Sequence, residues 1–169
     1  MDDNNKENIR PGNIIISSII GGILGGIVMV IVLMIGAMTL SLPPTAFPMV
    51  MGMALGASIN NAIIVGVIAH FVVSIVIGVI FGAIVSYIRP LNLKSSKKAL
   101  GLGLAAGLIV YLVAFIPVAM FMFAPVMIHM MGSSAATILP DVLGIAVIGH
   151  ILYGLILGIS AFKIGVRLS

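Results

Sequence analysis

The main feature of this sequence is a set of four long apolar segments separated by connections of a different character. The apolar segments cover residues 14–38, 62–87, 99–121 and 142–165. A helix crosses a hydrocarbon core of ~30 Å with ~20 apolar residues, so each segment is long enough to span a membrane. The pattern therefore predicts an all-α integral membrane protein with four transmembrane helices.

The connections divide the chain into two helical hairpins, predicted at 14–88 and 99–165. Polar residues predict a cytoplasmic tail at 1–13 and a C-terminus at 166–169, and the basic, turn-rich sequence RPLNLKSSKK predicts a linker at 89–98. The first apolar segment follows an acidic stretch and exceeds the ~7–15 residues of a signal-peptide core. We therefore expect it to be a retained helix.

The two hairpins superimpose without a gap when the sequence is shifted so that His70 falls on His150. The same shift superimposes Gly21 on Gly101, Asn61 on Asp141, and Gly78 on Gly158. Because each hairpin crosses the membrane twice, both copies enter from the same side, which predicts parallel repeats related by a pseudo-two-fold axis. Asn61 and Asp141 can accept backbone N–H bonds, so they are predicted to mark the starts of the second and fourth helices.

Composition agrees with a membrane protein, since 62% hydrophobic and 7% charged residues cannot cover a water-soluble globule of 169 residues. The lack of cysteine excludes disulfides and thiolate metal sites. Basic residues without interleaved aromatic residues are too few for a nucleic-acid interface. We expect the partners to be the lipid bilayer and other membrane subunits, and no nucleic acid.

The basic residues predict how the chain sits in the membrane. They are Lys6, Arg10, Arg89, Lys94, Lys97, Lys98, Lys163 and Arg167. All eight fall on one side of the predicted helices, which the positive-inside rule places in the cytoplasm. We predict a multi-pass protein of the cell (plasma) membrane with both termini cytoplasmic.

The two connections on the opposite side are unusually apolar. Residues 39–61 carry no charge, and residues 119–141 carry only Asp141 and His129 as ionisable groups. Such loops would be poorly solvated, so we expect them to lie in the membrane interface, to fold back onto the bundle or to pack beneath a partner.

Small residues recur at four-residue steps, which lets membrane helices approach closely. The residues predicted to pack helices together are Gly21, Gly25, Ser74, Gly78, Gly82, Gly103, Gly107, Gly154 and Gly158. His70 and His150 belong to the same series and are expected on the packing faces. Counted from Asn61 and Asp141, each lies nine residues, or ~13 Å, into its helix and so in the outer half of the membrane.

Histidines at equal depth on equivalent helices allow three interpretations. His70 and His150 could bind a cofactor, either as the two axial ligands of a b-type haem or as a shared copper site. They could line a path for a proton or a solute. The interpretation that we favour is structural: each imidazole bonds a carbonyl, a hydroxyl or the other histidine and fixes the register of the bundle.

Eight of the 12 methionines lie in or beside the apolar connections. Thioether and imidazole groups are soft ligands that suit Cu(I), whereas methionine also fills irregular gaps beneath apolar loops, which is the interpretation we favour. The M-x-M-x-M spacing shares one face only in an extended segment. The candidate metal ligands are Met49, Met51, Met53, His129, Met130 and Met131.

Catalytic chemistry has little support. Asp141 is the sole acid outside the N-terminal tail, so paired carboxylates for acid–base work are lacking. We predict no catalytic residues and no autonomous enzyme.

Residues His150, Tyr153, Gly154 and Gly158 form the pattern His-x-x-Tyr-Gly-x-x-x-Gly. In this respect the chain resembles a group of small four-helix membrane proteins that are common in archaea. The first copy departs from the pattern, because Val73 and Ser74 replace the tyrosine and the first glycine. In overall style the chain also resembles the small helical subunits of archaeal ammonia monooxygenase, a copper enzyme, and this resemblance implies a role beside such an enzyme.

Together these features predict a non-catalytic accessory or structural subunit of a larger membrane complex, for instance a copper-dependent monooxygenase. Two alternatives remain open from the sequence. One is a small carrier or homo-oligomeric channel for a small solute, a proton or a metal ion, and the other is a bis-histidine b-type cytochrome.

Overall fold

The computed structural model describes residues 10–169, and all regular secondary structure in that part of the chain is helical. Four helices are long and apolar enough to cross a membrane: α1 (Pro11–Thr39), α3 (Ala62–Tyr87), a third continuous helix (Ser96–Met131) and α7 (Ser134–Leu168). The predicted all-α class with four helices of spanning length is thereby confirmed.

The third helix is built from five successive segments. They are α4 (Ser96–Ile109), the π-helical η2 (Val110–Phe115), α5 (Ile116–Val118), the π-helical η3 (Ala119–Phe123) and α6 (Ala124–Met131). Pro117 and Pro125 each lack an N–H and crowd the carbonyl four residues earlier, which belongs to Val113 and to Phe121. Both of these carbonyls lie in the wider π segments, which accommodate the two prolines without ending the helix.

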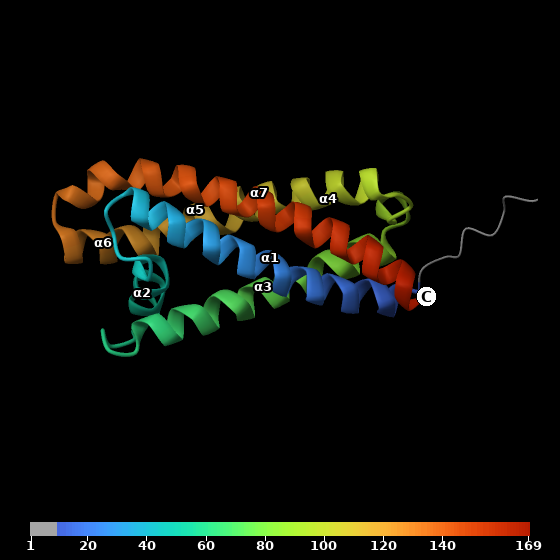
Figure 1. The fold of residues 1–169 in the computed structure, drawn as a ribbon, viewed down its shortest axis with the longest axis horizontal. Coiled ribbons are helices and arrows are strands. Elements are labelled where there is room, and N and C mark those ends of the chain that lie inside the picture. The colour runs from blue at the N-terminus through green and yellow to red at the C-terminus, as the bar shows by residue number, and fades with distance from the viewer. Residues whose placement is uncertain (1–9) are drawn as a thin grey trace, which may run out of the picture.

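The long helices run along a common axis, and residue 10 and the C-terminus lie at the same end of the molecule (Figure 1). We call this the terminal end. From it α1 and the third helix run to the opposite, distal end, and α3 and α7 run back. The short helices α2 (Ala46–Ala54) and η1 (Arg89–Leu91) lie at the distal and the terminal end respectively.

Helix α1 packs between α3 and α7, and α7 packs between α1 and α4. The helices therefore form a row in the order α3, α1, α7, α4, with α3 and α4 at its two edges. In a symmetric pair of hairpins, α4 would correspond to α1, and α7 would correspond to α3. The contact between α1 and α7 would then have a counterpart between α4 and α3. The row does not have this contact, so the two hairpins are not packed symmetrically.

The apolar connections at the distal end are mostly helical. Residues 39–61 fold back onto the bundle through α2, which packs on α3. A Cβ at Gly52 of α2 would collide with the Ala62 backbone of α3, and a Cβ at Gly66 of α3 would collide with the Pro48 backbone of α2. Residues 119–141 belong almost wholly to the third helix and α7, which meet at Gly132 and Ser133. The predicted spans at 99–121 and 142–165 are therefore too short at their distal ends.

The two predicted helix starts have different outcomes. Asn61 directly precedes α3, although its side chain makes no capping hydrogen bond. The prediction for Asp141 is wrong, because α7 begins at Ser134 and Asp141 lies exposed within it. The helix continues through Pro140, which lies in its interior and lacks the N–H that would bond to the carbonyl of Ala136.

Candidate functional site

A cavity of about 190 Å³ lies among the four long helices and α2, and we call it the histidine cavity. His70 from α3 and His150 from α7 both line it, together with Ser74 and Tyr153. The rest of its wall is apolar. The structure thus brings the two histidines to one place, even though α7 begins before Asp141 and His150 lies deeper in its helix than predicted.

Each histidine is held by one hydrogen bond to a backbone carbonyl. His70 Nε2 lies 3.2 Å from the oxygen of Gly26 on α1, and His150 Nδ1 lies 2.8 Å from the oxygen of Ala146 in its own helix. Because a carbonyl only accepts, the proton sits on Nε2 of His70 and on Nδ1 of His150. The histidines are not hydrogen-bonded to each other.

The second nitrogen of each ring makes no hydrogen bond in the described part of the chain. Within residues 10–169 only Ser18 Oγ is a fully buried side-chain nitrogen or oxygen without a hydrogen-bond partner. His70 Nδ1 and His150 Nε2 have no partner in that part of the chain, so neither is sealed by protein. In the neutral ring each carries a lone pair, and the cavity therefore holds two imidazole acceptors.

Aromatic rings from η2 fix the orientation of His150. The ring centroids of Tyr111 and Phe115 lie 5.4 and 4.9 Å from that of His150. Tyr111 is itself held, since its hydroxyl donates to the Leu143 carbonyl at 3.1 Å. The π-helical segment thus supplies two rings that pack on the imidazole, a role that sequence analysis missed.

A hydrogen bond joins the two hairpins beside the histidines. The Tyr153 hydroxyl donates to the Ser74 carbonyl at 2.8 Å, and both residues are buried. A Cβ at Gly22 would lie 2.5 Å from that carbonyl oxygen, and a Cβ at Gly26 would lie 2.8 Å from Ser74 Oγ. These two glycines of α1 therefore leave the room in which the bond forms.

The residues predicted for helix packing lie at helix–helix contacts. A Cβ at Gly103, Gly107, Gly154 or Gly158 would collide with the backbone of the facing helix in the α4–α7 pair. On α1, a Cβ at Gly21 or Gly25 would lie 2.9 Å from a side-chain atom of Ser160 or Tyr153 on α7.

On α3, a Cβ at Gly78 would lie 2.5 Å from the Ser18 oxygen, and one at Gly82 would lie 2.9 Å from the Ile15 Cα. Ser74 follows the same face, buried against α1. The space beside these glycines is thus filled by neighbouring helices, whereas Ser74 also lines the histidine cavity.

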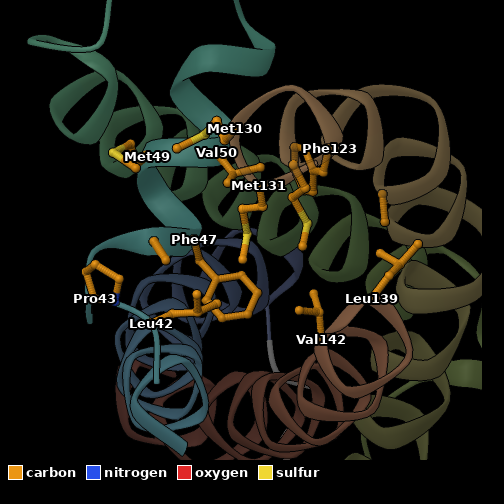
Figure 2. Close-up of a pocket in the computed structure, with 13 residues that line it drawn as sticks. Leu42, Pro43, Phe47, Met49, Val50, Phe123, Met130, Met131, Leu139 and Val142 are labelled. Atoms are coloured by element: carbon orange, nitrogen blue, oxygen red, sulfur yellow. The ribbon is translucent and has the colours of Figure 1, made fainter. Parts of the chain in front are cut away.

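A second cavity of about 250 Å³ lies at the distal end, and we call it the distal cavity. Met49, Met130 and Met131 line it, together with Met127, and all of its lining residues are apolar. Figure 2 shows the side chains of Met131 and Phe47 extending into the same space.

The structure does not bring the six predicted metal ligands together. Met51 lines the histidine cavity, Met53 lines neither cavity, and His129 is exposed and lines neither. The M-x-M-x-M run lies in α2, where about 100° of rotation per residue turns Met51 away from Met49.

Several lining residues were not anticipated from the sequence. Met29 and Met34 line the histidine cavity, so that it contains three methionines with Met51. Phe47 and Phe123 line both cavities and form the wall between them. These residues come from different helices, and only the tertiary fold brings them together.

The histidine cavity does not fit a haem. An apolar cavity of ~150 Å³ holds a benzene molecule, so about 190 Å³ is far too little for a porphyrin. The residues do suit a soft metal ion, because two histidines and three methionines line the space. Residues 10–169 contain no group of three His, Asp or Glu side chains that could hold a metal.

The fold and its cavities define a class: an all-helical protein with four helices of membrane-spanning length around a small, mostly apolar cavity with two imidazoles. No protein-family model, curated protein or solved structure matches the chain. Its function is therefore argued from its own residues.

Proposed function

We propose that this chain is a non-catalytic accessory or structural subunit of a larger membrane complex. The observation that carries the proposal is an exposed apolar face of the third helix, from η2 towards its distal end. Leu112, Val113 and Phe121 are 62%, 71% and 81% exposed there. Membrane helices associate through close packing with other helices, and methionines beside Phe121 offer a surface that adapts to a partner.

The basic residues support an orientation for this subunit. Those in the described chain lie at the terminal end: Arg10, the linker between α3 and α4, the first turn of α4 and the end of α7. The positive-inside rule assigns that end to the cytoplasm of a cell (plasma) membrane. The distal end, with both cavities near it, then faces outward.

A duplicated hairpin remains part of the proposal. Helix α3 ends at Tyr87, and α7 ends at Leu168. The stretch from His70 to Tyr87 is almost as long as the stretch from His150 to Leu168. The two histidines therefore sit at matching heights above the terminal end. The asymmetric row of helices means that the copies diverged in packing as well as in sequence, as Val73 in place of a tyrosine also indicates.

The resemblance described above names one candidate assembly. In a copper-dependent monooxygenase, such as archaeal ammonia monooxygenase, the methionine-rich outward end of this chain would lie beside a copper enzyme. In this proposal the chain supports the enzyme and performs no chemistry itself.

A photo-crosslinking amino acid at Val113 or Phe121 tests the proposal in native membranes. We expect adducts with a discrete second protein, because these positions lie on the exposed apolar face of the third helix. The matched control is Val76 on α3, which is 50% exposed and should give lipid adducts.

A protein that purifies alone, without a stoichiometric partner and with lipid adducts only, would overturn this proposal. An adduct of twice the 17.5 kDa chain mass would also contradict it and would favour a homo-oligomer.

A second candidate is a small carrier or homo-oligomeric channel. The histidine cavity favours it, because buried imidazoles inside a membrane bundle commonly mark ion or solute paths. In proteoliposomes, uptake of the monovalent ion Ag(I) should fall when His70→Ala and His150→Ala are combined, and should be unchanged in His129→Ala. Equal uptake by the double variant would remove this candidate.

A further inference from the structure

We infer that the histidine cavity is a binding site for a soft monovalent metal ion, Cu(I). His70 and His150 supply nitrogen ligands, and Met29 and Met51 supply thioether sulfurs. The inference concerns binding, and it holds whether the chain is a subunit or a carrier.

The hydrogen bonds of the two histidines prepare them to bind metal. A metal-binding imidazole generally donates its other N–H to a carbonyl or carboxylate, which fixes the tautomer and the direction of the lone pair. His70 and His150 both have this arrangement, with Gly26 and Ala146 as the carbonyl partners. The remaining nitrogen of each ring keeps a free lone pair, and both rings line the same cavity.

The charge of the lining selects the kind of ion. Within residues 10–169 no Asp, Glu, Lys or Arg side chain lines the cavity, so a bound ion receives no compensating charge from them. The cost of placing uncompensated charge in an apolar interior rises steeply with the charge, which disfavours divalent ions. Thioether and imidazole ligands are soft and neutral, and they select Cu(I) among the metals that proteins bind.

Met29 and Met51 line the same cavity as the two imidazoles. Met29 is only 7% exposed, and its Cγ would lie 3.2 Å from a Cβ at Gly149, the residue before His150. Met51 approaches from α2, which packs on α3 a turn from His70. A methionine side chain has three rotatable bonds, so its sulfur can move onto an ion that the imidazoles hold.

The distal cavity provides a route to this site. Its four methionines, Met49, Met127, Met130 and Met131, are thioether donors without imidazole. With the three in the histidine cavity, seven of the 12 methionines line the two adjoining spaces. The rings of Phe47 and Phe123 divide them, so an ion would pass from weaker sulfur ligands to the stronger mixed site.

Cu(I) binding by the purified full-length chain tests the inference. The protein in detergent is titrated anaerobically with Cu(I) in competition with a chromophoric chelator, and X-ray absorption identifies the ligands. We expect one tightly held Cu(I) per chain with both nitrogen and sulfur ligands. His70→Ala and His150→Ala should each lower the affinity by at least ~10-fold, while His129→Ala leaves it unchanged.

Methionine variants guard against a loss of folding in the histidine variants. Met29→Leu and Met51→Leu conserve volume, so they should weaken Cu(I) binding without a matching loss of thermal stability. A purely structural role of these side chains would leave the affinity unchanged.

Two results would overturn the inference. One is a folded wild-type chain that retains no Cu(I) against the chelator. The other is sulfur-only ligation that disappears in Met49→Leu and Met131→Leu but persists in both histidine variants. Neither result bears on the crosslinking test, so failure of the metal site and failure of the subunit proposal are distinguishable.

Discussion

The contacts among the four long helices differ between the terminal and distal halves of the bundle, although α2 also packs closely on α3 through Gly52 and Gly66 at the distal end. In the terminal half, glycines bring α4 onto α7 and α1 onto both α3 and α7, until backbone touches backbone. In the distal half the same helices carry methionine and phenylalanine at their contacts and leave two cavities. Glycines let two helices pack in a single close arrangement, whereas long flexible side chains leave cavities whose shape can adapt to a bound group. We therefore assign stability mainly to the terminal half and binding to the distal half.

Among the substitutions considered, Gly103→Leu should lower the free energy of unfolding the most. The new side chain would meet the backbone of Gly154 and Gly158, so α4 must leave α7. Overpacking of this kind should lower the free energy of unfolding by about 3 kcal/mol or more, measured by SDS-induced unfolding in mixed micelles. The control is Gly101→Leu on the same helix, where a Cβ has nothing within 4 Å. Equal stability of the two variants would contradict the close α4–α7 contact.

Tyr153→Phe should have an intermediate effect. It removes the hydroxyl that donates to the Ser74 carbonyl and keeps the ring in place. A hydrogen bond between membrane helices contributes about 1 kcal/mol, which the same unfolding assay can resolve. Tyr87→Phe serves as the control, because its side chain is 71% exposed and should change nothing. An unaltered midpoint for Tyr153→Phe would mean that the bond adds no stability.

Phe121→Ala should have the smallest effect. Its ring packs on little of its own chain, so the isolated protein should change by no more than about 0.5 kcal/mol. The counterpart in the terminal half is Phe81→Ala, which empties a buried position and should cost about 3 kcal/mol. Comparable losses in the two variants would show that the halves do not differ as we describe.

The fold was largely predictable from the sequence, because the length of an apolar segment is a direct consequence of the bilayer thickness. The second helix was predicted at 62–87 and lies at Ala62–Tyr87. The third and fourth helices extend beyond the predicted segments at their distal ends, because residues 119–141 were predicted as a loop and are almost wholly helical. Two π segments carry the carbonyls that Pro117 and Pro125 crowd, and local sequence rules do not contain that information.

The candidate site was predictable only in part. Histidines in apolar helices drew attention to His70 and His150, and they do line one cavity. Their neighbours Tyr111, Phe115 and Met29 could not be found in this way, because aromatic and methionine residues are ordinary in a membrane helix. The metal set that included His129 failed to assemble, since spacing along α2 and α6 does not specify which side of a helix faces the interior.

The fixed tautomers of the two histidines have a consequence for proton conduction. A relay requires each imidazole to accept a proton on one nitrogen and release one from the other. The releasing nitrogens here, Nε2 of His70 and Nδ1 of His150, point at the carbonyls of Gly26 and Ala146, which have no proton to pass on. A proton relay through the pair would therefore require at least one ring to break its carbonyl bond and turn.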